Sequence, residues 1–94
     1  MVNLIELDCG RTEITDVNML TNLKKLYCDS TKINNIDNLI NLTELICNSS
    51  MIINIDKLIN LTSLWCSDTK IKDVSKLVKL QELTCDNTEI KDVS

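Results

Sequence analysis

The sequence contains no histidine, no proline and no phenylalanine, and it has one glycine, one tryptophan and one tyrosine in 94 residues. Without histidine, neither a histidine-based triad nor a histidine acid–base pair can form. With Gly10 as the single glycine, the chain has no glycine-rich phosphate-binding loop. We therefore expect a protein that is not an enzyme and that uses no cofactor.

Strong charge and long apolar segments are also missing. The net charge is −4, and acidic and basic residues are interspersed. Nucleic-acid binders present a basic face, so we expect no nucleic-acid partner. The longest apolar runs, such as Met51-Ile52-Ile53, are far shorter than the roughly 20 residues that a membrane-spanning helix needs. The first ten residues do not have the pattern of a secretory signal, and we expect no contact with a membrane.

The scarcity of aromatic residues predicts a particular kind of core. Leucine and isoleucine are abundant, whereas aromatic residues make up 2% of the chain. A small compact domain usually fills its centre with aromatic rings, so this composition favours stacked aliphatic side chains. Because proline is absent and glycine occurs once, no linker is visible, and we expect one structural unit over residues 1–94.

Five cysteines recur at intervals of 19 residues, and the apolar residues follow the same spacing. The cysteines are Cys9, Cys28, Cys47, Cys66 and Cys85. The repeated unit reads L-x-x-L-x-C-x-x-T-x-I-x-x-[VI]-x-x-L-x-x, and its [VI] position ends at Val93. The units span residues 4–22, 23–41, 42–60, 61–79 and, incompletely, 80–94.

A strict period of this length indicates a solenoid in which each unit is one turn. The Leu-x-Cys alternation is typical of a short strand, and strands stacked in this way must run parallel. About ten residues bring the chain back, which leaves room for a one-turn helix or a 3₁₀ segment. We expect these segments to begin after Asp16, Asp37, Asp56 and Asp73. Asp or Asn side chains near those starts can cap free backbone N–H groups.

The unit resembles the leucine-rich repeat, L-x-x-L-x-L-x-x-N/C-x-L. The T-x-I-x-D-V segments, such as Thr12 to Val17, are similar to those of internalin-type bacterial repeats. The resemblance implies a right-handed solenoid of five stacked turns, of class α/β by family convention, with mostly short parallel strands and 3₁₀ or irregular returns. Similar short repeats occur in AT-rich bacteria and giant DNA viruses, and we expect such a source.

The sequence departs from the family pattern in two columns. Cysteine replaces the third leucine of the strand, and threonine or serine replaces the asparagine that in the family bonds to adjacent turns. A hydroxyl has one donor and no amide, so we expect weaker bonding between turns at this column.

Three roles are open to the cysteines. They can be small buried side chains, since free cysteine is among the most buried residue types. Disulfides between neighbouring turns have an unfavourable geometry, and an odd count leaves one thiol unpaired. A straight column does not offer the tetrahedral arrangement that zinc prefers. We favour buried, reduced thiols and therefore a cytoplasmic location.

The residues that alternate with leucine and cysteine are expected to face outward, and in the family this face binds ligands. Both aromatic residues of the chain, with one isoleucine between them, occupy three consecutive outward positions bordered by carboxylates. Contiguous exposed apolar groups tend to mark interaction sites, although the same three side chains can simply pack across the strands. The predicted contact residues are Tyr27, Ile46, Trp65, Glu44, Asp29 and Asp68.

The pattern thus predicts a protein–protein interaction module whose partner has some basic character. Two alternatives fit the same residues. Neither end of the chain carries an atypical capping repeat, so the chain is expected to be a fragment of a longer array or to self-associate through its open ends. It can also be the substrate-recognition part of a larger ligase or effector.

Overall fold

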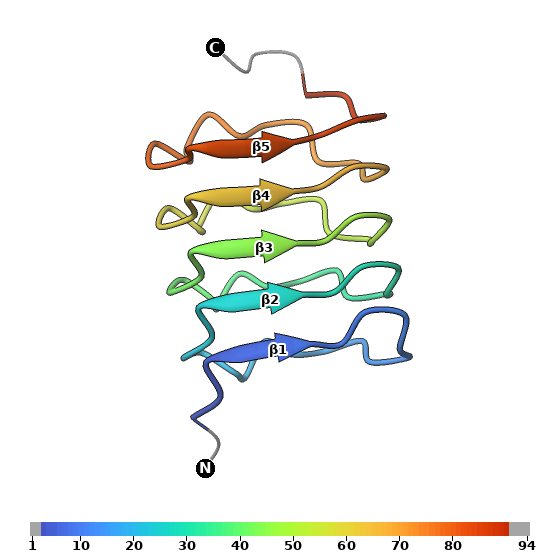
Figure 1. Cartoon of the computed structure of the whole chain (residues 1–94), viewed down its shortest axis with the longest axis vertical. Coiled ribbons are helices and arrows are strands. Elements are labelled where there is room, and N and C mark those ends of the chain that lie inside the picture. The colour runs from blue at the N-terminus through green and yellow to red at the C-terminus, as the bar shows by residue number, and fades with distance from the viewer. Residues whose placement is uncertain (1–2, 91–94) are drawn as a thin grey trace.

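The computed structural model describes residues 3–90, and in it the chain forms one parallel five-stranded sheet. The strands are β1 (Glu6–Asp8), β2 (Lys25–Tyr27), β3 (Glu44–Ile46), β4 (Ser63–Trp65) and β5 (Glu82–Thr84), and they lie in chain order. Figure 1 shows the strands stacked on one side and the return segments on the other. The predicted solenoid of parallel strands is confirmed. No described residue lies in a helix, and hence none lies in a helix able to cross a membrane.

The 19-residue period sets the pairing of the strands. Leu26 pairs with Leu45, and Leu45 pairs with Leu64, so equivalent residues of successive turns lie side by side. The backbone N–H of Cys28 donates to the carbonyl of Ile46, and the Cys47 N–H donates to the Trp65 carbonyl, each at 2.8 Å. Residues that are 19 positions apart in the sequence therefore lie next to each other on neighbouring strands.

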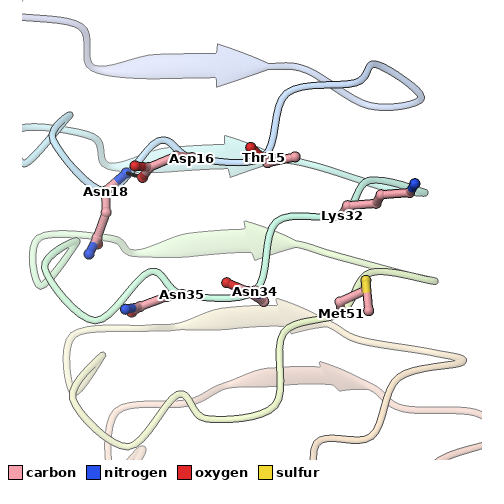
Figure 2. A pocket seen from close by; sticks show the side chains of 7 residues that line it. All are labelled: Thr15, Asp16, Asn18, Lys32, Asn34, Asn35 and Met51. Atoms are coloured by element: carbon pink, nitrogen blue, oxygen red, sulfur yellow. Dashed lines mark hydrogen bonds between the residues drawn. The ribbon is translucent and has the colours of Figure 1, made fainter.

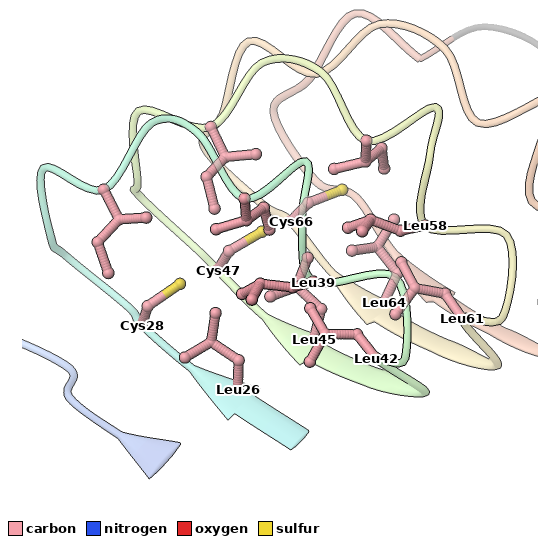
Figure 3. Close-up of a cluster of buried hydrophobic side chains, with 14 of the residues drawn as sticks. Leu26, Cys28, Leu39, Leu42, Leu45, Cys47, Leu58, Leu61, Leu64 and Cys66 are labelled. Carbon is pink, nitrogen blue, oxygen red and sulfur yellow. The ribbon is translucent and has the colours of Figure 1, made fainter. Parts of the chain in front are cut away.

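The core consists of columns of aliphatic and cysteine side chains that run along the solenoid. Leu26, Leu45 and Leu64 have no exposed surface, and the same holds for Cys28 and Cys47. Figure 3 shows these columns between the strands and the returns. Burial of a leucine contributes about 1.5–3 kcal/mol, so repeated columns of this kind supply most of the stabilisation. The predicted aliphatic core is confirmed.

The chain leaves each strand through one residue in the left-handed backbone region. These residues are Arg11, Ser30, Ser49, Asp68 and Asn87, with φ between 55° and 60°. None is glycine, although a non-glycine residue costs roughly 1–2 kcal/mol in this conformation. The threonine column follows directly. The hydroxyl of Thr31 donates to the carbonyl of Cys28 at 2.8 Å, and Thr69 does the same to Cys66 at 2.6 Å. Threonine therefore closes its own turn rather than joining neighbours.

The return segments consist of two successive tight turns, so they are the irregular returns that were expected, and neither a one-turn helix nor a 3₁₀ segment forms in the described residues. In the first unit, Leu20 N–H donates to Val17 O at 3.0 Å, and Leu23 N–H donates to Leu20 O at 3.1 Å. These i→i+3 bonds recur in the next three units and satisfy the backbone locally. The predicted Val93 position lies outside the described residues.

The prediction that Asp or Asn side chains cap the starts of the returns is confirmed, although two of the four starts lie two residues earlier than predicted. Asp16 and Asp73 accept a hydrogen bond from the backbone N–H two residues later, as expected. In the two units between them, the acceptors are Asn35 and Asn54, and Asp37 and Asp56 supply the donor N–H groups at 3.0 and 2.9 Å. The 19-residue period places the asparagines, not those aspartates, in the column of Asp16.

The left-handed residue of the third turn gives a test of this geometry. We expect Ser49→Gly to stabilise the fold by about 0.5–1 kcal/mol, because glycine removes the strain at φ 57° and this outweighs its larger entropy loss. The neighbouring Ser50→Gly is the matched control. Ser50 is 8% exposed and has a negative φ, so replacing it with glycine removes a buried side chain without relieving strain and should destabilise the fold. Urea unfolding of both variants measures the effects, and destabilisation by Ser49→Gly would contradict the turn geometry.

Candidate functional site on the strand face

The predicted contact residues lie on the outer side of the sheet, which we call the strand face. It comprises the outward residues of β1–β5 and the two residues that begin the turn after each strand. Within it, Tyr27 pairs with Ile46, and Ile46 pairs with Trp65. Trp65 is 43% exposed, whereas Tyr27 and Ile46 are partly covered. The structure therefore brings the three apolar residues together in one row, and their role in binding stays a prediction.

Glu44 fixes one end of this row. The Tyr27 hydroxyl donates to Glu44 Oε1 at 3.1 Å, and Lys25 Nζ lies 3.9 Å from Glu44 Oε2. The hydrogen bond to the carboxylate raises the pKa of Tyr27 above its ordinary value, with smaller contributions from partial desolvation and nearby carboxylates. An exposed ion pair contributes little to stability. The hydrogen bond links the tyrosine hydroxyl of β2 to the carboxylate of Glu44 in β3.

A column of polar side chains joins successive turns beside the row. Asp29 Oδ1 accepts the Asn48 N–H at 2.9 Å, Asn48 Oδ1 accepts the Ser67 N–H at 2.8 Å, and Ser67 Oγ accepts the Asp86 N–H at 3.1 Å. The sequence reasoning missed this role, although the recurring Asp/Asn/Ser at one position signalled it. Bonding between turns, expected to weaken at the threonine column, is thus supplied two positions earlier.

The two remaining predicted aspartates are partly engaged within the protein. One oxygen of Asp29 serves the column just described. Asp68 Oδ1 accepts a hydrogen bond from Asn87 Nδ2 at 2.6 Å, and the Asp68 side chain is exposed. Both therefore contribute to local structure while presenting negative charge at the strand face.

The cysteines lie on the opposite, inner side of the strands. All five are free thiols; Cys85 is half-buried and the other four are buried. Burial raises the pKa of Cys28 to about 12 and that of Cys66 to about 11, and it raises the pKa of Cys47 well above its ordinary value. The prediction of buried thiols is confirmed. A protonated, enclosed thiol is a poor nucleophile, and residues 3–90 contain no cluster of three or more potential metal ligands.

The return side carries a shallow recess of about 510 Å³. Figure 2 shows it between the returns of successive turns, lined mainly by polar side chains. Several of its polar atoms already have partners. Asp16 and Asn35 cap their own turns, and Asn18 Oδ1 accepts the Asn38 N–H at 2.9 Å. These side chains build the turns, so the recess is a weaker candidate site than the strand face.

The family assignment rests on comparison with known proteins. A family model for two copies of leucine-rich repeats matches residues 59–94. The functional domain of InlJ from Listeria monocytogenes, described as including a cysteine ladder, is similar over 97% of this chain, with 26% identity and a TM-score of 0.80. Internalin C2 of the same organism is similar at 35% identity over 97% of the chain, with a TM-score of 0.79. The chain is a leucine-rich-repeat protein.

A third solved structure, the internalin inlF of Listeria monocytogenes, shares the fold at 24% identity over 89% of the chain, with a TM-score of 0.56. The leucine-rich-repeat chain spans 22%, 46% and 35% of the three solved chains. No curated protein matches its sequence significantly.

The buried thiols predict a loss of stability in alkali. Folded Cys28, Cys47 and Cys66 keep their protons above pH 9.0, the ordinary thiol value, whereas the unfolded chain releases them. The free energy of unfolding should therefore fall above about pH 9, by up to about 1.4 kcal/mol per pH unit for each thiol. Urea unfolding under reducing conditions at pH 8 to 11 measures this slope. A Cys28→Ala/Cys66→Ala variant should lose part of it, and an unchanged slope would contradict the account.

Proposed function

We propose that this leucine-rich-repeat protein is a protein–protein interaction module that binds its partner through the strand face. Leucine-rich-repeat folds generally serve as interaction modules. The observation that carries the proposal is the row of Tyr27, Ile46 and Trp65. It gathers both aromatic residues of the chain on one side of the sheet. Tyrosine and tryptophan are enriched among the residues that dominate binding energy.

The rigidity of the row supports the same proposal. The backbone carbonyls of Ile46 and Trp65 accept hydrogen bonds from the preceding turns, and Glu44 holds the Tyr27 hydroxyl. A surface that is ordered before binding loses little conformational entropy when a partner arrives. The row is therefore suited to contact a folded or extended protein segment without rearrangement.

Packing across the strands explains part of the row but not all of it. Neighbouring side chains on one face of a sheet stabilise each other, and Ile46 lies between the two aromatic residues. Trp65 nevertheless keeps 43% of its surface exposed, whereas Leu64, the residue before it in β4, has no exposed surface. Exposure of so large an apolar ring favours a binding role in addition to the structural one.

The alternative roles stay predictions. They are self-association through the solenoid ends, recognition of substrates within a larger ligase or effector, and a position within a longer array. The cytoplasmic location also stays a prediction. Because the chain spans less than half of each of the three solved chains described above, the activity of a longer protein would include contributions from elsewhere.

A paired set of variants tests the proposal. We expect Tyr27→Ala/Trp65→Ala to weaken partner binding by at least about 30-fold, since one dominant contact residue is worth about 2 kcal/mol or more. The control is Ile40→Ala/Ile59→Ala, which removes two side chains of 51% and 52% exposure from the return side. Immobilised protein is used to capture partners from a lysate of the source organism, and quantitative mass spectrometry compares the variants.

Stability and mass measurements complete this experiment. Urea unfolding must show that both variants keep the fold. Retention of every specific partner by the Tyr27→Ala/Trp65→Ala variant would overturn the proposal. Light scattering over a range of concentrations distinguishes self-association from binding of a different protein. A molecular mass that grows with concentration favours self-association through the ends.

A further inference from the structure

The charges of the chain are unevenly distributed between its two sides. The strand face holds seven of the 14 acidic residues but only two of the ten basic residues, Arg11 and Lys25. Its formal charge is therefore −5, while the whole chain carries −4. The remaining surface is close to neutral and slightly basic. The acidity suggested by the composition is thus a property of one face.

The two basic residues of the face both lie at its β1–β2 end. Lys25 begins β2 and approaches Glu44, and Arg11 follows β1. They are accompanied in the first three turns by four carboxylates, which are Glu6, Asp8, Asp29 and Glu44. This half of the face therefore has a formal charge of −2 and contains both basic residues of the face.

The β4–β5 half has carboxylates without counter-charges. Glu82 begins β5 and lies diagonally across from Trp65, and Asp68 and Asp86 follow the two strands. All three are exposed. Within the described chain, none of them lies within 4.0 Å of a lysine or arginine nitrogen. The most exposed apolar residue of the row, Trp65, therefore lies in the half of the face that holds three carboxylates and no basic residue.

We propose that the protein partner of the strand face presents a basic segment to the β4–β5 half and places an arginine or lysine side chain on Trp65. This inference rests on the proposed function and adds the chemistry of the partner. A guanidinium or ammonium group stacks favourably on an indole ring. The flanking carboxylates attract the same group, and complementary charge across an interface speeds association and selects the partner. An acidic or uncharged segment gains neither contact.

Trp65 is the only tryptophan, so its fluorescence reports on this half of the face alone. Hexa-arginine is the probe, and hexa-glutamate and hexa-glutamine are the comparison peptides. We expect hexa-arginine to change the fluorescence with saturation below about 1 mM and with weakening at higher salt. The comparison peptides should cause no saturable change. Absence of saturation with hexa-arginine, or an equal response to hexa-glutamate, overturns the inference.

Two charge-matched variants separate local attraction from the general acidity of the chain. Asp68→Asn/Glu82→Gln/Asp86→Asn removes three carboxylates around Trp65. Glu13→Gln/Asp37→Asn/Asp56→Asn removes the same number of charges from the rest of the surface. The first variant should bind hexa-arginine at least about tenfold more weakly, and the second should bind as the parent protein does. Equal weakening of both would refute a basic site at Trp65.

The outcome is distinguishable from failure of the proposed function. If hexa-arginine does not bind but the Tyr27→Ala/Trp65→Ala variant still loses its natural partner, the strand face binds a protein of different chemistry. If hexa-arginine binds as expected and no natural partner depends on Tyr27 or Trp65, the proposed function falls while the charge preference of the face stands.

Discussion

The hydrogen bonds between the backbones of successive turns are the interaction on which the rest of the structure depends. In the first four turns the cysteine N–H donates to a carbonyl of the next turn. A second bond lies four residues before the cysteine of the donating turn, as from Lys24 N–H to Ile5 O at 2.8 Å. A third is made by the left-handed residue, three positions after the strand, as from Ser30 N–H to Asn48 O at 2.9 Å. These bonds fix the pairing, and a shift of pairing by one residue would move every strand leucine out of the core.

The inner and outer sides of the strands are fixed together by this pairing. Because side chains alternate along a strand, Leu45 and Cys47 can point inward only if Glu44 and Ile46 point outward. The cysteine column is thus the counterpart of the exposed row. Small thiols fill the space between strand and return, and their burial leaves them protonated and chemically quiet. The cysteines, which in the sequence suggest a reactive or metal-binding site, are packing residues of the core. The strand face on the opposite side of the sheet carries the proposed function.

The sequence predicted the features that are repeated and missed those that depend on local geometry. Parallel strands, the buried columns and the outward row followed from the period alone. The left-handed conformation at Ser30 and Ser49 could not be predicted, because these residues rarely adopt it and no glycine marks the position. Caps by Asp or Asn were predicted, but the positions of Asn35 and Asn54 were not, because either side chain can cap a turn and an aspartate follows two residues later in both units. The unneutralised charge around Trp65 required the pairing of β4 with β5 to be known.

Residue-by-residue amide hydrogen exchange, measured by NMR at neutral pH, tests the pairing of the turns most directly. The account predicts that the amides of Cys28, Cys47 and Cys66 exchange slowly and to a similar degree, because each donates to the next turn at 2.8 Å. The amides of Met51 and Ile53, which lie in an exposed part of the return, should exchange much faster. Fast exchange at Cys47, or protection that does not recur every 19 residues, would contradict the account.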